Sequence, residues 1–209
     1  LVVTVWFAAP GKTPQEIEKR LAYKKHLSEG DNFLSRGSLG SAQVSFEHAS
    51  ALMPGLWSPH FKQGIVFGAQ NKFEKAEKQY RLALDIYPDH PSILANYGAT
   101  LAVLGKTDQA ETFLRNAIRQ RPNNSNAYNS LAQIYLTQNK LEKAKDMLLL
   151  AVSVNPNFGI GYANLAMLYA MINQSDQAKA YLKIARELGV KNSTVDNLQK
   201  ILQNSIPTP

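Results

Sequence analysis

Residues 125–158 read SNAYNSLAQIYLTQNKLEKAKDMLLLAVSVNPNF, and this stretch decides the fold because the chain repeats its pattern every 34 residues. Alanine occupies the position of Ala144 in five successive blocks of 34 residues, and it also occupies the position of Ala151 in all five. A fixed period of this length is the signature of a stacked array of small structural units. Within the blocks, apolar residues recur three and four apart, which is the spacing of an α-helix.

The five blocks align without insertion or deletion as residues 23–56, 57–90, 91–124, 125–158 and 159–192. Each has a small residue early, an alanine, a large apolar residue, a second alanine and, in the first four, a proline near the end. The small residues are Gly30, Gly64, Gly98, Ala132 and Ala166, and the large ones are Phe46, Tyr80, Leu114, Leu148 and Leu182. Small residues let two helices approach closely, and proline stops the second helix. Each block is therefore predicted to form a helix hairpin.

One position between the two predicted helices of every block is always glycine or asparagine. These residues are Gly37, Asn71, Gly105, Asn139 and Asn173. Glycine and asparagine tolerate a left-handed backbone best, and such a backbone ends a helix. We therefore interpret this position as the turn of the hairpin. In the third block, Thr107 or Asp108 is expected to cap the helix that follows.

Two Gly-Lys-Thr triplets, at residues 105–107 and 11–13, suggest the alternative of a nucleotide-binding loop. Such a loop needs another glycine five residues before the first one, so that backbone N–H groups surround the phosphate. The chain has Thr100 and Trp6 at those places. The triplets are therefore interpreted as a hairpin turn and a helix start, not as phosphate sites.

Residues 1–22 precede the first block and contain an apolar arm followed by a helix start. The arm, LVVTVWFAA, is too short to cross a bilayer. It is either the end of a membrane or signal segment, or an arm that packs on the domain or drives self-association through residues 1–10. Thr13, Pro14 and Glu16 then match a capped helix N-terminus. The compartment stays open, with an exported, periplasmic or membrane-anchored location favoured over the cytoplasm.

Residues 193–209 follow the last block and are expected to form a capping helix and a tail. Val195, Leu198, Ile201 and Leu202 fall on one face of a helix that opens at Ser193. A stacked array needs such a cap because its last unit would otherwise expose an apolar face.

The five blocks resemble the tetratricopeptide repeat family, whose 34-residue pattern places large residues, alanines and a proline at these positions. The resemblance implies an all-α fold, a right-handed solenoid of five helix-turn-helix repeats with a C-terminal capping helix. The first two blocks depart from the family pattern. They have His26 and His60 where a large residue is usual, and Glu29 and Gln63 where leucine is usual.

Composition and motifs argue against catalysis, cofactors, metals and nucleic acid. The chain has no cysteine and four scattered histidines, and we find no nucleophile motif. Its net charge of +7 is spread along the blocks, whereas nucleic-acid binders gather positive charge into a stripe. The chain is therefore expected not to be an enzyme, and to meet a membrane only through an N-terminal anchor.

The resemblance implies that a partner binds in the concave groove lined by the first helix of each repeat. Carried over to this sequence, the groove comprises Leu27, Leu34, Phe61, Ile65, Asn96, Ala99, Val103, Asn129, Gln133, Asn164, Met167 and Met171. The alternative is that several of these side chains only pack between repeats. The terminal-carboxylate clamp of co-chaperone members is largely absent, because Leu27, Asp31, Lys62, Ser92 and Asn96 stand at its places.

The groove residues are small in the middle of the array. At its C-terminal end they include Met167 and Met171, and the flexible methionine side chain adapts to irregular apolar partners. We therefore expect a non-catalytic scaffold or adaptor subunit of a multi-protein assembly, which binds a mildly apolar or helical protein or peptide segment. One alternative is a membrane-tethered or exported assembly factor or chaperone that holds an apolar client segment. Another is the regulatory domain of an enzyme.

Overall fold

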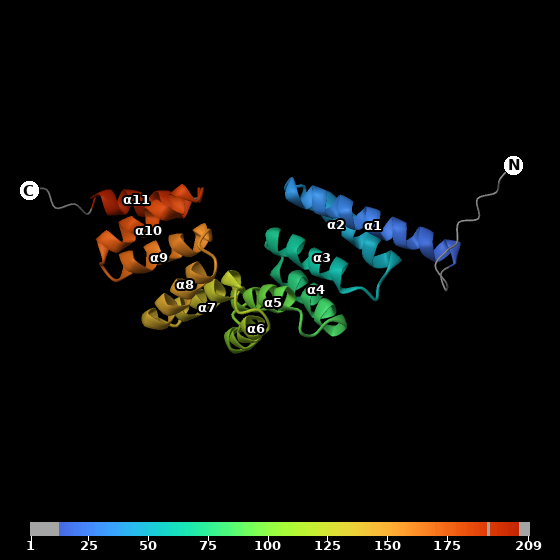
Figure 1. Cartoon of the computed structure of the whole chain (residues 1–209), viewed down its shortest axis with the longest axis horizontal. Coiled ribbons are helices and arrows are strands. Elements are labelled where there is room, and N and C mark those ends of the chain that lie inside the picture. The colour runs from blue at the N-terminus through green and yellow to red at the C-terminus, as the bar shows by residue number, and fades with distance from the viewer. Residues whose placement is uncertain (1–12, 192, 205–209) are drawn as a thin grey trace, which may run out of the picture. The chain divides into compact units, whose positions relative to one another are not determined.

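A computed structural model describes residues 13–191 and 193–204, and within them the chain forms α-helices joined by short turns (Figure 1). The chain divides into two compact units, residues 1–88 and 89–209, which are described in turn as unit 1 and unit 2. The interpretations of the apolar arm, residues 1–10, concern a segment outside the described residues.

Unit 1 consists of two helix hairpins. Its helices are α1 (Pro14–Ser35), α2 (Leu39–Leu52), α3 (Trp57–Ala69) and α4 (Phe73–Ile86). Helix α1 packs on α2, α2 on α3, and α3 on α4. Helix α1 begins before the first repeat with the predicted cap. The Thr13 hydroxyl accepts a hydrogen bond from the Glu16 N–H at 3.2 Å, and the Glu16 carboxylate accepts one from the Thr13 N–H at 2.9 Å.

Unit 2 contains the other three hairpins and the capping helix. Its helices are α5 (Pro91–Val103), α6 (Thr107–Gln120), α7 (Ser125–Thr137), α8 (Leu141–Val154), α9 (Gly159–Met171), α10 (Ser175–Glu187) and α11 (Ser193–Asn204). Each helix from α5 to α10 pairs within its hairpin, and α5 also contacts α7, so first helices of neighbouring repeats are adjacent. The all-α fold built from consecutive helix pairs is thus confirmed.

The predicted hairpin turns have left-handed backbones. The φ angles are +73° at Gly37, +57° at Asn71, +75° at Gly105, +55° at Asn139 and +60° at Asn173. In each turn, the N–H of the residue after the left-handed one donates a hydrogen bond to the carbonyl five residues before it, such as Lys106 N–H to Leu101 O at 2.9 Å. The Gly-Lys-Thr triplet at 105–107 is therefore a turn, as the repeat pattern predicts.

The predicted cap of the helix after this turn is wrong. Lys106 is the N-cap of α6, and its side chain makes no capping hydrogen bond. Thr107 is already the first helical residue, and its hydroxyl donates to the Gly105 carbonyl at 3.4 Å. The turn admits one residue between the left-handed glycine and the helix, which leaves Thr107 and Asp108 past the cap position.

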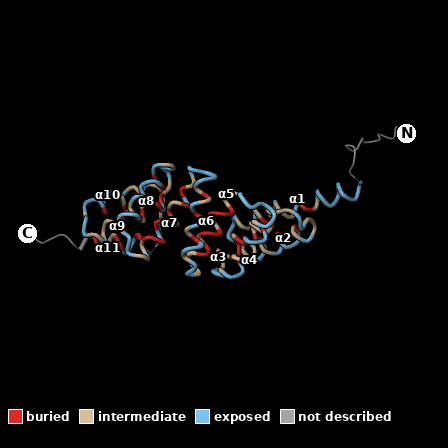
Figure 2. Tube along the Cα trace, turned by 90° about the horizontal axis from the view of Figure 1, so that it is seen from below, coloured by how far each residue is buried: buried red, intermediate tan, exposed pale blue. Residues whose placement is uncertain are grey.

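The buried residues lie in the interior between the helices (Figure 2). In the first three hairpins, a glycine of the first helix faces a large residue of the second. An added Cβ at Gly64 would lie 2.4 Å from the Tyr80 ring, and one at Gly30 would lie 2.4 Å from the Phe46 ring. Contacts this short are forbidden, so the glycines allow the helices to approach.

Helix α11 caps the apolar end of the last repeat. Val195, Leu198 and Leu202 are buried in one cluster with Ala166 and Ala185. An ion pair between Arg186 and Asp196, at 2.7 Å, joins α10 to α11. The predicted capping role of this helix is confirmed for these three side chains.

Candidate partner-binding face

The predicted groove residues of unit 2 lie along the three first helices α5, α7 and α9. We define the first-helix face of unit 2 by Ala99 and Val103 on α5, Gln133 on α7, and Met167 and Met171 on α9. Val103 and Met171 stand at the C-terminal ends of their helices and are 60% and 58% exposed. At this exposure, a partner can reach both side chains.

A pocket of about 260 Å³ lies between α5 and α7 on this face. It is lined by Ala99, Ala102, Val103, Thr107, Ser130, Gln133, Ile134 and Thr137. The buried Ile134 contributes an apolar surface, while Ser130, Gln133 and Thr137 add polar groups at the side. Small and apolar residues therefore leave a recess of side-chain size beside Val103.

The predicted asparagines are engaged within the fold. The Asn164 amide donates to the Oδ1 atom of Asn129 at 2.7 Å, which links α9 to α7, and Asn129 is buried. The Asn96 amide donates to the Ser92 carbonyl one turn earlier, at 2.8 Å. These bonds fix the amides, so Asn129 and Asn164 act first as a polar link between two repeats.

In unit 1, the predicted groove side chains are largely occupied by the unit's own packing. Leu27 and Leu34 pack against the core cluster of Ala42, Phe46 and Val66.

Aromatic and charged contacts complete this packing in unit 1. The Phe61 ring lies 5.9 Å from Trp57 and 6.0 Å from Tyr80, measured between ring centroids, and Ile65 on the same helix is half-buried. Lys62 and Asp31 form an ion pair at 2.7 Å.

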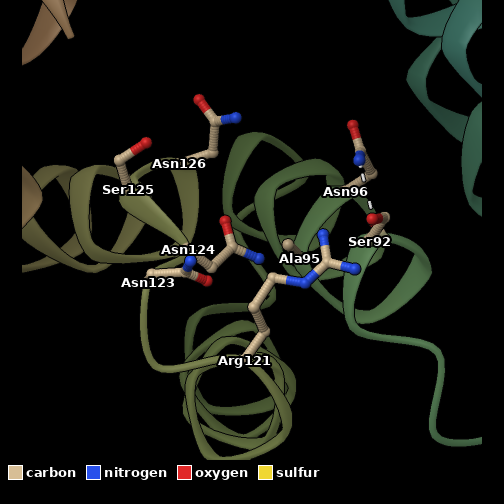
Figure 3. Close-up of a pocket in the computed structure, with 8 residues that line it drawn as sticks. All are labelled: Ser92, Ala95, Asn96, Arg121, Asn123, Asn124, Ser125 and Asn126. Carbon is tan, nitrogen blue, oxygen red and sulfur yellow. Dashed lines mark hydrogen bonds between the residues drawn. The ribbon is translucent and has the colours of Figure 1, made fainter. Parts of the chain in front are cut away.

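A second, polar pocket of about 380 Å³ opens at the N-terminal ends of α5 and α7 (Figure 3). It is lined by Ser92, Ala95, Asn96, Arg121, Asn123, Asn124, Ser125 and Asn126. Three of these residues, Arg121, Asn123 and Asn124, escape a prediction based on first helices, because Arg121 is the C-cap of α6 and the two asparagines follow it in the turn. The sequence feature that could have indicated this pocket is the run RPNNSN at residues 121–126, in which amide and hydroxyl side chains follow an arginine.

Arg121 raises the local electrostatic potential. The pKa of His90, the residue before α5, is lowered by burial and then by the positive charge of Arg121. Both effects disfavour the charged imidazolium, so Arg121 remains the positive group of the pocket.

A hydrogen-bonded network joins α6 to α7. The Tyr135 hydroxyl donates to Glu111 at 2.9 Å, and Arg115 contacts both groups. The pKa of Glu111 is lowered, mainly by its hydrogen bond from Arg115, and burial raises the pKa of Tyr135. These groups satisfy one another, so the network is interpreted as a structural link between repeats.

The described part of the chain contains no cluster of three or more histidine, aspartate or glutamate side chains able to hold a metal ion. Across residues 13–191 and 193–204, no helix combines the length and apolar character that a bilayer crossing requires.

Several solved structures are similar to this fold. PilF of Pseudomonas aeruginosa is 22% identical, with a TM-score of 0.75 over 90% of this chain and 85% of that one. PilW, a widely conserved type IV pilus biogenesis factor, is 19% identical, with a TM-score of 0.75 over 88% and 87%. YrrB, a tetratricopeptide repeat protein with an unusual peptide-binding site, is 16% identical, with a TM-score of 0.59 over 89% and 96%.

Comparison with the curated proteins finds no match. The tetratricopeptide repeat family model matches residues 69–129 and, in a second overlapping match, residues 105–163. Together the two matches span residues 69–163, which contain the third and fourth blocks and parts of the second and fifth. Residues 69–163 therefore match the tetratricopeptide repeat family, and the chain is similar in fold to solved tetratricopeptide repeat proteins.

Proposed function

We propose that this chain is a non-catalytic scaffold or adaptor subunit that holds a segment of a partner protein along the first-helix face of unit 2. The observation that carries the proposal is the exposure of Val103 and Met171, with a recess of side-chain size beside Val103. Exposed apolar side chains that line a recess gain free energy when a partner covers them.

The size of the recess indicates what it holds. Pockets for cofactors and drug-sized ligands measure about 300–1,000 Å³, whereas this one measures about 260 Å³ and is lined by small side chains. It suits a side chain of a peptide better than a cofactor. Full burial of an apolar side chain contributes about 1.5–3 kcal/mol, so a few such contacts support micromolar binding rather than a permanent assembly.

The solved relatives are consistent with this proposal. YrrB is described as having a peptide-binding site, and PilW as a biogenesis factor, on folds of the same kind. The alternative function, an assembly factor or chaperone that holds an apolar client segment, is favoured by the likeness to PilW. A scaffold should copurify with its partner in a fixed ratio, whereas an assembly factor should release its client.

Selection from a random peptide library tests the proposal. Phage-displayed 12-mers are selected on the full chain, and the affinity of synthetic versions is measured by calorimetry for the wild type and two variants. Val103→Arg places a charge on the first-helix face. Leu150→Arg is the matched control, because Leu150 is an exposed apolar residue of α8, a second helix, and is 40% exposed.

We expect Val103→Arg to weaken peptide binding about tenfold or more, because it puts a desolvated charge where an apolar contact was. Leu150→Arg should leave the affinity within about twofold, since exposed substitutions away from a site have small effects. Circular dichroism of both variants checks that they fold. Equal loss in both variants, or loss only in Leu150→Arg, would contradict the proposed face.

A further inference from the structure

The three first helices of unit 2 carry no charged side chain. Aspartate, glutamate, lysine and arginine are all absent from α5, α7 and α9, although charged residues make up 19% of the chain. The second helices α6, α8 and α10 each contain both acidic and basic residues. In unit 1, Asp31 of α1 and Lys62 of α3 place charges on first helices. The uncharged first helices therefore distinguish unit 2 from unit 1.

Burial does not account for this absence of charge. Val103, Ile160 and Met171 are more than half exposed, and Gln133 and Thr137 are exposed as well. Water would solvate a charged side chain at these positions, which are of the kind that usually carry charges. The helix ends give the same indication, because α5, α7 and α9 have no acidic residue in the first turn and no basic residue in the last. All three helices thus lack charges that would stabilise them through the helix dipole.

A row of equivalent positions crosses the first helices of unit 2. Val103, Thr137 and Met171 follow one another at intervals of 34 residues, end α5, α7 and α9, and are all exposed. Helix α5 contacts α7, and the hydrogen bond between Asn164 and Asn129 joins α9 to α7. The row therefore runs over three adjacent helices, with an apolar side chain at each end and a neutral polar one in the middle.

The spacing of the helices sets the length of the segment that can cover this row. Packed helices lie about 8–10 Å apart, so the three helix axes span roughly 16–20 Å. An extended chain advances about 3.3 Å per residue, so roughly five or six residues cross the row. This is the shortest segment that can contact Val103 and Met171 at the same time.

A charged side chain on such a segment would lose its water at this face and find no opposite charge there. Desolvating an ion costs far more than desolvating a neutral polar group, unless a counter-ion replaces the water. Gln133 and Thr137 can serve neutral groups, since an amide and a hydroxyl both donate and accept hydrogen bonds. The face therefore suits neutral residues and disfavours acidic and basic residues alike.

We propose that the first-helix face of unit 2 selects an extended partner segment of about five or six consecutive uncharged residues, with an apolar side chain at each end. The inference rests on the proposed function and narrows its partner. A mildly apolar segment in general tolerates charges beside its apolar contacts, whereas the segment proposed here excludes charges of both signs.

A charge scan of the bound peptides is the first test. It uses a selected 12-mer whose affinity falls in Val103→Arg, replaces each position in turn by aspartate, lysine or asparagine, and measures binding to the full chain by calorimetry. Within one run of about five or six positions, aspartate and lysine should each weaken binding about tenfold or more. Away from the two apolar ends of the run, asparagine should weaken it less than about threefold. If only one sign of charge weakens binding, the face is not selecting a neutral segment and the inference is wrong.

Charges introduced on the face give the second test. Gln133→Lys should restore affinity about threefold or more for a peptide with aspartate in the middle of the run, and Gln133→Glu should do so for one with lysine. The same substitutions at Gln109, an exposed glutamine of the second helix α6, should restore neither. Circular dichroism checks that the variants fold. Equal rescue from Gln109 and Gln133 would show a general field effect and overturn the inference.

The salt dependence of the unmodified peptide is the third test. Raising the salt concentration from about 0.05 M to about 0.5 M should change its Kd by less than about twofold, because salt screens charged pairs only. A tenfold weakening would mean that charges hold the segment, which contradicts the inference.

The outcomes separate this inference from the proposed function. If peptides respond to Val103→Arg but tolerate both charges at every position, the uncharged segment is refuted and the proposed face stands. If no selected peptide responds to Val103→Arg, the proposed face is refuted and this inference falls with it.

Discussion

At the scale of single residues, the hairpins depend on pairing a small side chain with a large one. Gly64 faces Tyr80 and Gly98 faces Leu114, and a Cβ added at either glycine would collide with its partner. The equivalent places in the fourth and fifth repeats hold Ala132 and Ala166, and both are fully buried.

Gly64→Ala should therefore destabilise the protein. Its Cβ would lie 2.4 Å from Tyr80, and overpacking of this kind costs about 1–3 kcal/mol. Gly68→Ala, on the same helix, meets nothing within 4 Å and should stabilise it by about 0.5–1 kcal/mol. Urea denaturation followed by circular dichroism measures both. Equal effects on the free energy of unfolding would show that the close approach at Gly64 is not real.

Sequence reasoning succeeds at residues whose backbone is special and fails where a side chain's direction matters. The left-handed turns at Gly105 and its equivalents are predictable because few residues accept that backbone. Arg121 is not, because its guanidinium is placed by the turn between α6 and α7. The same holds for the link between Asn129 and Asn164, which needs two repeats to be in contact.

At the scale of the element, α11 shows how the array ends. Its buried residues Val195, Leu198 and Leu202 cover the last repeat only, so its influence should be local. The spacing of its apolar residues, three and four apart, is sufficient to predict this helix and its buried face. The structure agrees with this prediction because a capping helix needs only an amphipathic pattern and a neighbouring repeat with an exposed apolar side.

Leu198→Ser should loosen the last repeat while leaving the rest of unit 2 folded. Removing this buried side chain costs about 2–3 kcal/mol, and stability in a stacked array is lost first where it is removed. Asn197→Ser, at an exposed position of the same helix, is the control. Hydrogen exchange should accelerate in α9, α10 and α11 and stay slow in α5 and α6. Uniform acceleration across unit 2 would instead indicate one cooperative block.

At the scale of the whole molecule, the repeat pattern predicts the hairpins but treats every repeat alike. The structure distinguishes them. The first-helix residues Leu27 and Leu34 of unit 1 pack into its core, whereas Val103 and Met171 of unit 2 are exposed. This difference depends on which neighbours cover a position, which a 34-residue period does not record.

Site-specific photocrosslinking tests most directly the claim that a partner segment lies along the first-helix face of unit 2. The photoreactive amino acid p-benzoylphenylalanine is placed at Val103 or Met171 on that face, and at Leu149 or Leu150 on α8 as exposed apolar controls. A labelled peptide selected on the wild type is then irradiated with each protein. The account predicts crosslinks from Val103 and Met171 and only background from Leu149 and Leu150. Crosslinks confined to the α8 positions would contradict it.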